Sequence, residues 1–203
     1  MQISRQVLLM SVLMALPAGM GLPGKAKSET MAEVTTPAVL VEQFVATAAR
    51  AENATALQET IATLFDVEAM SKMIVGRLTW RDWTGVQQHA FVDRMTLFIA
   101  TMIVSRREQE AEPATEIFET REGPSGTQIV STRSHFNGEP VRVDYHLRDK
   151  DGVWTIVDIV ADAKISEVAR RRAEFSSIIL AQGHAGILAA LEQKIRQMEP
   201  TGG

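Results

Sequence analysis

The segment 141–183 constrains the fold most, because within it the apolar pattern changes from a period of two to a helical period. Apolar and polar residues alternate over 141–148, as in a strand with one buried and one solvated face. Asp151-Gly152 then supplies a turn that accepts positive φ, and a second apolar run follows, which predicts a β-hairpin. Ser166 can cap a helix that Gly183 ends. This amphipathic helix should fold back over the apolar face of the sheet.

Helical spacing dominates the chain before this segment. We expect a first helix over 37–50, capped by Thr36, and a second that starts after a break at Asn53. Asp66 should cap a third, short helix that Gly76 closes. Several helices therefore precede the hairpin.

A longer helix follows a connector that we expect to be polar and that contains Trp80 and Trp83. Thr84 and Gln87 have the spacing of a capping box, and the helix they open should stop near Arg107. Its apolar positions form the clearest amphipathic stripe in the sequence: Phe91, Met95, Phe98 and Met102.

The second half of the chain predicts an antiparallel sheet. Alternating runs at 114–120 and 127–134 read as strands, and Asn137-Gly138 is a strong hairpin signal before the strand at 141. Together with the hairpin they give a four-stranded meander, and the last helix is expected over 185–198. Helices, a meander and closing helices indicate an α+β fold, with helices on one face of the sheet. Curved sheets of this kind, as in the NTF2-like architecture, leave an apolar space between sheet and helices.

The N-terminal segment has the pattern of a secretory signal. Residues 1–28 hold Arg5, an apolar run too short for a confident membrane span, and small residues near a cleavage site, although a retained anchor is an alternative. We expect 29–36 to be a flexible start, 37–198 to form one domain and 199–203 to be a frayed tail. The sequence contains no Cys, which excludes a lipoprotein lipidated on cysteine.

Charge argues against a nucleic-acid partner. Removal of residues 1–28 takes away Arg5, Lys25 and Lys27 and no acid, which leaves 18 basic and 25 acidic side chains, a formal charge of −7. Proteins that bind nucleic acid carry a basic face instead.

No catalytic or metal site is evident. The four histidines (His89, His135, His146 and His184) do not form pairs at ligand spacing, and no G-x-S-x-G is present. Asp144 and His146 share a strand face and could be an acid–base pair, but alternation already explains them as a polar, solvated face. We therefore expect neither an enzyme nor a cofactor.

Several segments of the sequence resemble the MlaC-like family, which is also called the toluene-tolerance family. The resemblance covers about Val39 to Lys194 and includes FDVEAMSKMIVGRLTWRDWTGVQQHAF, then VDYHL, WTIVDI, an I-S pair, R-x-x-F and a later Q-G. Members of this family are periplasmic phospholipid-binding partners of an ABC transport system. A hopanoid-associated branch of the family is an alternative.

The resemblance implies that the apolar space is a phospholipid pocket. Residues expected to line it are Met70, Met73, Ile74, Phe91, Met95, Phe98, Met102, Val143, Tyr145, Leu147, Trp154 and Ile156. Without the resemblance, the methionine and phenylalanine stripe would be read as an ordinary core. Arg77 and Arg81, beside Trp80 and Trp83, are candidates for the headgroup end.

A shuttle must also dock to partners. Arg170, Arg171 and Arg172 span most of a helical turn, so they are either a solvated helix face or a docking patch. The expected function is transport of lipid through the periplasm between an inner-membrane ABC complex and an outer-membrane lipoprotein complex. Two rivals remain, an NTF2-like enzyme that uses Asp144 or His146 as a base and an interaction module without a ligand.

Overall fold

The computed structural model of the chain describes residues 35–108, 115–136 and 139–199. The helices before the sheet are α1 (Pro37–Arg50), α2 (Ala54–Leu64), α3 (Val67–Val75), α4 (Arg77–Asp82) and α5 (Gly85–Glu108). The strands are β1 (Glu116–Glu122), β2 (Gln128–Phe136), β3 (Glu139–Lys150), β4 (Val153–Ala161) and β5 (Ile165–Ser166), with a short 3-10 turn, η1 (Pro124–Gly126), between β1 and β2. The last helix is α6 (Glu167–Met198).

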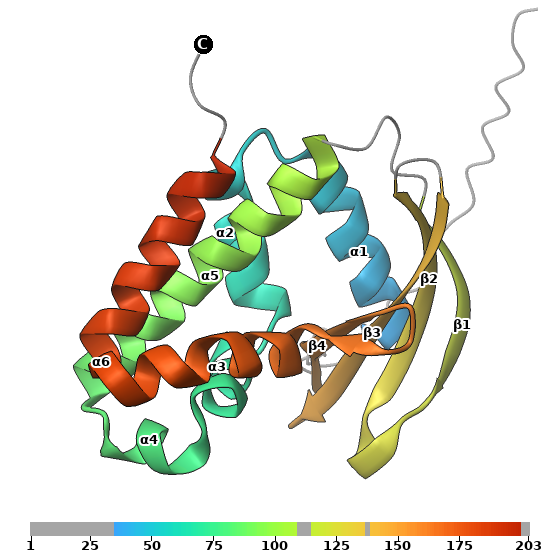
Figure 1. Cartoon of the computed structure of the whole chain (residues 1–203). Helices are drawn as coiled ribbons and strands as arrows, with labels where there is room; N and C mark the ends of the chain where they lie inside the picture. Colours follow the sequence, from blue (N-terminus) through green and yellow to red (C-terminus); the bar gives the residue numbers. More distant parts are fainter. Residues whose placement is uncertain (1–34, 109–114, 137–138, 200–203) are drawn as a thin grey trace, which may run out of the picture. The chain divides into compact units, whose positions relative to one another are not determined.

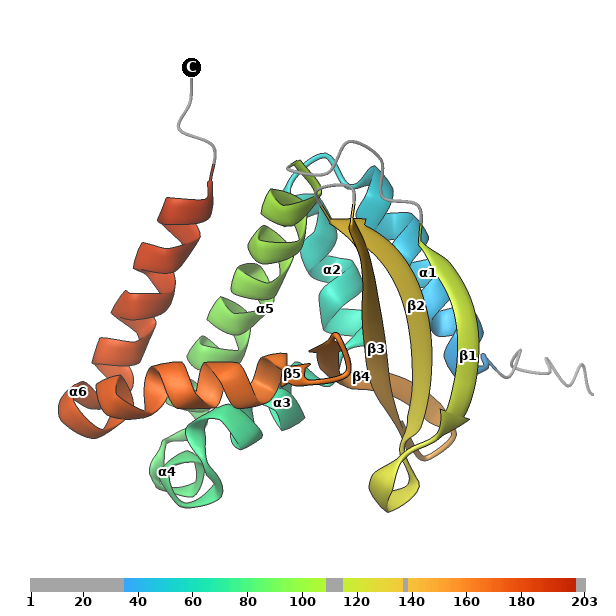
Figure 2. The same ribbon diagram turned by 45° about the vertical axis from the view of Figure 1, so that its right-hand side comes forward.

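The strands form one antiparallel sheet in the order β1-β2-β3-β4-β5, with the helices on one of its faces (Figures 1 and 2). The predicted α+β meander is therefore confirmed, with five strands instead of four. The fifth strand was missed because it is only two residues long and lies directly before the cap of α6. Asp162 and Ala163 adopt positive φ of 52° and 54°, which turns the chain back so that Ile165 pairs with Ala161.

Local hydrogen bonds explain where the helices begin. The predicted caps Thr36, Asp66 and Ser166 each accept a hydrogen bond from a backbone N–H three residues later, and Asn53, expected only as a break, caps α2 in the same way. In the capping box, the Gln87 side chain accepts from the Thr84 N–H at 2.9 Å and the Thr84 hydroxyl accepts from the Gln87 N–H at 3.3 Å. Caps of this kind are readable from sequence because each needs only neighbours in the chain.

Two predictions about the helices are corrected by the structure. Trp80 was expected in a polar connector, but it lies in α4 and is buried, because it packs edge-on against Phe91. The two expected closing helices are joined as α6, which bends at Gly183 (φ 62°, ψ −152°) where the break was predicted. The hairpin signal Asn137-Gly138, residues 1–34 and residues 200–203 lie outside the described residues.

Within the described part of the chain, α6 is the one helix long and apolar enough, by length and composition, to cross a membrane. In this structure α6 packs on its neighbours, with Phe175, Ile187 and Leu191 buried.

The face of the sheet away from the helices carries a buried charge. Asp144 was expected to be solvated, but its side chain is only 2% exposed. Its carboxylate accepts from Arg142 Nε at 2.7 Å and from Arg121 Nη2 at 3.2 Å, and Arg142 also donates to Ser131 Oγ at 2.9 Å. Burial by itself raises the pKa of Asp144, but hydrogen bonds from Arg142 and Ser131 outweigh it and lower that pKa below its ordinary value. Asp144 is therefore ionised at neutral pH and pairs with both arginines.

We predict that Arg142→Ala lowers the free energy of unfolding at neutral pH by about 1.5–3 kcal/mol, because Asp144 loses its main charged donor. Since the pKa of Asp144 is lowered in the folded state, the stability it contributes is present at neutral pH and is lost as the pH falls through its folded pKa. The free energies of unfolding of wild type and variant, measured with urea, should thus become equal at acidic pH. Arg148→Ala, an exposed arginine on the same strand, is the control, and an equal loss at both pH values would contradict this account.

Candidate functional site

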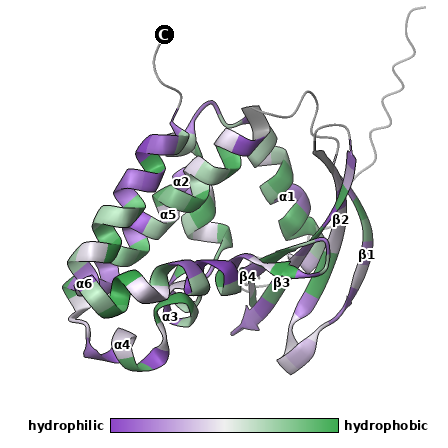
Figure 3. Cartoon of the chain, in the orientation of Figure 1, coloured by the Kyte–Doolittle hydropathy of each residue, from purple (hydrophilic) through white to green (hydrophobic). Residues whose placement is uncertain are grey.

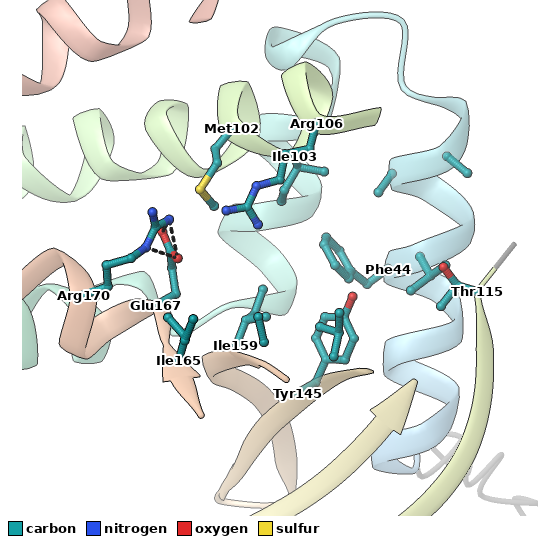
Figure 4. A pocket seen from close by; sticks show the side chains of 15 residues that line it. Phe44, Met102, Ile103, Arg106, Thr115, Tyr145, Ile159, Ile165, Glu167 and Arg170 are labelled. Atoms are coloured by element: carbon teal, nitrogen blue, oxygen red, sulfur yellow. Dashed lines mark hydrogen bonds and ion pairs between the residues drawn. The ribbon is translucent and has the colours of Figure 1, made fainter. Parts of the chain in front are cut away.

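An apolar cavity lies between α1, the end of α5, the sheet and the start of α6. Its volume is about 340 Å³, within the range of small-molecule sites. The 15 residues that line it are drawn in Figure 4: Phe44, Val45, Ala48, Ala49, Met102, Ile103, Arg106, Thr115, Val143, Tyr145, Ile159, Ala161, Ile165, Glu167 and Arg170. Ten of them are aliphatic, phenylalanine or methionine side chains, so the cavity is suited to hydrocarbon.

Small side chains on facing elements explain why this space is not filled. Ala48 and Ala49 line it from α1, and Ala161 lines it from β4. The aromatic rings beside them pack on one another, with the centroids of Phe44 and Tyr145 5.8 Å apart. Because alanine side chains reach only one carbon from the backbone, the two layers cannot close at native packing density here.

The charged groups of the cavity gather at the side formed by α5 and α6. Arg106 extends toward the cavity from α5, and Arg170 lies across from it on α6 (Figure 4). The Arg170 guanidinium donates to both Glu167 oxygens, with a shortest distance of 2.7 Å. The cavity thus has an apolar body and one cationic side.

Asp158 of β4 fixes the start of α6 at the cavity wall. Its carboxylate accepts from the backbone N–H of Val168 at 3.1 Å and from the Ser166 hydroxyl at 2.5 Å. The Ser166 oxygen in turn accepts from the Ala169 N–H at 3.0 Å. These bonds tie the first turn of α6 to the sheet, so that Ile165, Glu167 and Arg170 keep their places on the cavity.

Two other hollows are less suited to an apolar ligand. One, of about 570 Å³, is larger, but polar and charged residues such as Glu59, Asp66, Glu68 and Asp93 make up much of its lining. The other, of about 220 Å³, lies between α1 and α2 and is also mainly polar. The first of these is the larger, but transfer of hydrocarbon from water is favourable only when the surroundings are apolar. The cavity between α1 and the sheet is therefore the better site for an apolar ligand.

The structure places only some of the expected pocket residues on the cavity. Met102, Val143 and Tyr145 line it. The closed core contains Met70, Ile74, Phe91, Met95, Phe98, Leu147 and Ile156, with Met73 and Trp154 packed against it. The stripe of α5 therefore divides, since only its last member, Met102, reaches the cavity.

The arginines expected at the headgroup end or in a docking patch lie in three different environments. Arg77 and Arg81 lie on α4 and do not line the cavity, whereas Arg170 does. Arg171 was expected on a solvated face or a docking patch, but it is buried, with its guanidinium 4.5 Å from the centroid of the Phe98 ring. It bonds Glu167 and Glu174 and also donates to Met102 Sδ at 3.3 Å. Although burial raises the pKa of Glu174, hydrogen bonds from Lys194 and Arg171 lower it below its ordinary value.

Sequence reasoning missed most of the α1 wall. The pair Ala48-Ala49 one turn after Phe44 was the available signal, because short side chains on a core-facing helix leave room. Ile103 and Arg106 continue the face of Met102 and could have been reached by extending the stripe. Glu167 and Ile165 carried no signal, since their positions depend on the fifth strand.

Comparisons with known proteins agree with this architecture. The chain matches the family model described as MlaC protein over residues 34–193. No curated protein matches it in a sequence comparison. Among the solved structures, it is similar to the phospholipid-binding protein from Ralstonia solanacearum, determined in complex with a phospholipid, with a TM-score of 0.66 and 18% sequence identity. The match covers 79% of this chain and 97% of that chain.

The structural likeness, at this identity, shows a shared fold, which is the NTF2-like arrangement of sheet and helices expected from the sequence. The family match is independent of the coordinates and includes every strand and all but the last few residues of α6. On these grounds the chain belongs to the MlaC protein family, as its sequence resemblance indicated.

Proposed function

We propose that this chain is a carrier that binds a phospholipid with its acyl chains in the cavity between α1 and the sheet. The apolar cavity of about 340 Å³ is the observation that carries the proposal. Membership of the MlaC family and the fold shared with a protein described as phospholipid-binding support it. Each methylene moved from water into such a space contributes about 0.8 kcal/mol, so the chains would supply most of the affinity.

The lipid contacts we propose are Met102, Val143 and Tyr145 from the expected set, together with Phe44 and Ile103. Phe44 and Tyr145 present aromatic rings, and Met102 and Ile103 face them from α5 (Figure 4). Methionine is unbranched and deformable, so it can adapt to chains of different length.

Arg106 and Arg170 are proposed to face the phosphate of the lipid. Guanidinium groups bind phosphate oxygens in pairs of parallel hydrogen bonds, and these two flank the polar side of the cavity. A phosphate at Arg170 would compete with Glu167, which now accepts its hydrogen bonds. Charge at the cavity thus favours an anionic phospholipid over a neutral lipid such as a hopanoid.

Transport by such a protein needs no bond-making. We propose that residues 1–28 direct export to the periplasm and that the loaded carrier passes lipid between an inner-membrane ABC complex and an outer-membrane lipoprotein complex.

The rival enzymatic function finds less support. Asp144 and His146 alternate with Tyr145 along β3, so they face the side of the sheet opposite the cavity. Burial lowers the pKa of His146, which keeps its imidazole neutral. The imidazole could therefore act as a base, but His146 does not line the cavity. Asp144 is held by Arg142 and Arg121.

We predict that Ala48→Phe removes the bound lipid, because the added ring occupies the cavity. Loss of even two buried methylenes, at about 0.8 kcal/mol each, weakens binding about tenfold. Native mass spectrometry of protein purified from a Gram-negative host should show a lipid-sized mass on wild type and little on the variant. Ala189→Phe, on an exposed position of α6, should retain the lipid. A wild type without any bound mass would favour the ligand-free module instead.

A further prediction concerns headgroup preference. Wild type should bind phosphatidylglycerol more tightly than diacylglycerol with the same chains, because only the former has a phosphate for Arg106 and Arg170. Arg106→Gln/Arg170→Gln should reduce this preference about tenfold, since hydrogen bonds to charged groups contribute about 1.5–3 kcal/mol. Arg148→Gln/Arg196→Gln is the control, and competition between the two lipids is the measurement. Equal affinity of wild type for both lipids would refute a role for these arginines.

A further inference from the structure

The three most exposed large apolar side chains of the described residues belong to elements that meet at one end of the helical layer. Leu180 of α6 is 86% exposed, Val86 of α5 81% and Leu78 of α4 66%. Figures 1 and 2 show α4, the first turn of α5 and the bend of α6 together, far from β1. We call this region, which consists of α4, the first turn of α5 and the part of α6 around Gly183, the α4 end. Single exposed apolar residues are common on proteins, but a group of them marks a contact surface.

The α4 end is a rigid platform. The ring of Trp83 packs on Phe91 and on His184 of α6, with centroids 5.4 Å and 4.8 Å away. His184 Nε2 donates to the Gln87 carbonyl at 2.9 Å, and the Gln88 amide donates to the Trp80 carbonyl at 2.7 Å. These bonds join α4, α5 and α6, so the exposed side chains project from fixed backbone.

Charge at the α4 end differs from the rest of this acidic protein. Segments 73–91 and 172–190 contain two carboxylates, and both are already paired: Asp82 with Arg81 at 3.1 Å, and Glu174 with Arg171 and Lys194. Arg77 and Arg81 are exposed there. Arg172 joins them, because its guanidinium donates to the Met73 carbonyl at 3.1 Å, next to the start of α4. Exposed apolar side chains with exposed arginines on the same or neighbouring elements are complementary to an anionic lipid surface.

The composition of α6 also favours contact with a lipid surface. Its most apolar stretch would by length and composition suit a membrane, yet only 22% of that stretch is buried here. In Figure 3, α6 is mostly white to green on either side of its bend and purple toward both ends. Because α6 bends at Gly183 and buries Phe175 and Ile187 against the protein, it can touch a bilayer without crossing it.

We propose that the α4 end binds the surface of a membrane that contains anionic phospholipid. Leu78, Val86 and Leu180 would enter the boundary between headgroups and acyl chains, while Arg77, Arg81 and Arg172 face lipid phosphates. A protein partner is the less favoured occupant, since leucine and valine, the exposed apolar residues here, are under-represented among the anchor side chains of protein interfaces. The proposal does not depend on what the cavity binds.

Flotation with vesicles tests the proposal. Wild type should float with vesicles of phosphatidylethanolamine and phosphatidylglycerol and much less with pure phosphatidylcholine. Val86→Asp/Leu180→Asp should lose about tenfold or more of this binding, because two apolar side chains become charged. Val39→Asp/Val153→Asp, the same change at exposed positions on α1 and beside the β3–β4 turn, is the matched control and should bind as wild type does.

A second variant controls for loss of binding through misfolding. Arg77→Gln/Arg81→Gln leaves the apolar residues in place and should weaken binding to anionic vesicles alone, while thermal melting of all variants stays at the wild-type value. All proteins share the same N-terminus, so any difference reports the α4 end. Absence of wild-type flotation, or equal flotation of Val86→Asp/Leu180→Asp, overturns the proposal and would assign the exposed side chains to a protein partner.

Discussion

The fit between α1 and the inner face of the sheet is the constraint on which the rest of this structure depends. Phe44 packs edge-on against both Phe65 and Tyr145, so α1, the α2–α3 connection and β3 are held around one ring. Beyond that ring, the alanines of α1 and β4 leave the layers apart, and the cavity is the result. If α1 carried larger side chains, the same fold would have a solid interior.

Most of the fold could be predicted because its signals are local. Ser166, Asp66 and the Thr84–Gln87 pair cap helices through residues three positions away, and such bonds need no knowledge of tertiary structure. The alternation along β3 likewise separates the face of Tyr145 from that of Asp144. The burial of Asp144 could not be predicted, because besides Arg142 it involves Arg121, which approaches from another strand.

The site was predictable only in part for a related reason. Apolar periodicity shows that Met95, Phe98 and Met102 face inward, but not whether a neighbour fills the space before them. Phe98 meets Phe175 and the Arg171 guanidinium of α6, and its surroundings are closed. Met102, one turn later, lies where α6 gives way to the cavity wall. Tertiary packing, and not the stripe itself, divides core from cavity.

A cavity on the sheet side and an exposed α4 end give the chain two separate surfaces, one for holding a lipid and one for meeting a membrane. Binding of lipid acyl chains in the cavity is the central claim. Its most direct test is a crystal structure of the protein loaded with phospholipid whose acyl chains carry bromine. We predict anomalous peaks beside Phe44, Ile103 and Tyr145. Peaks between α5 and α6 near Phe98, or none within the protein, would contradict it.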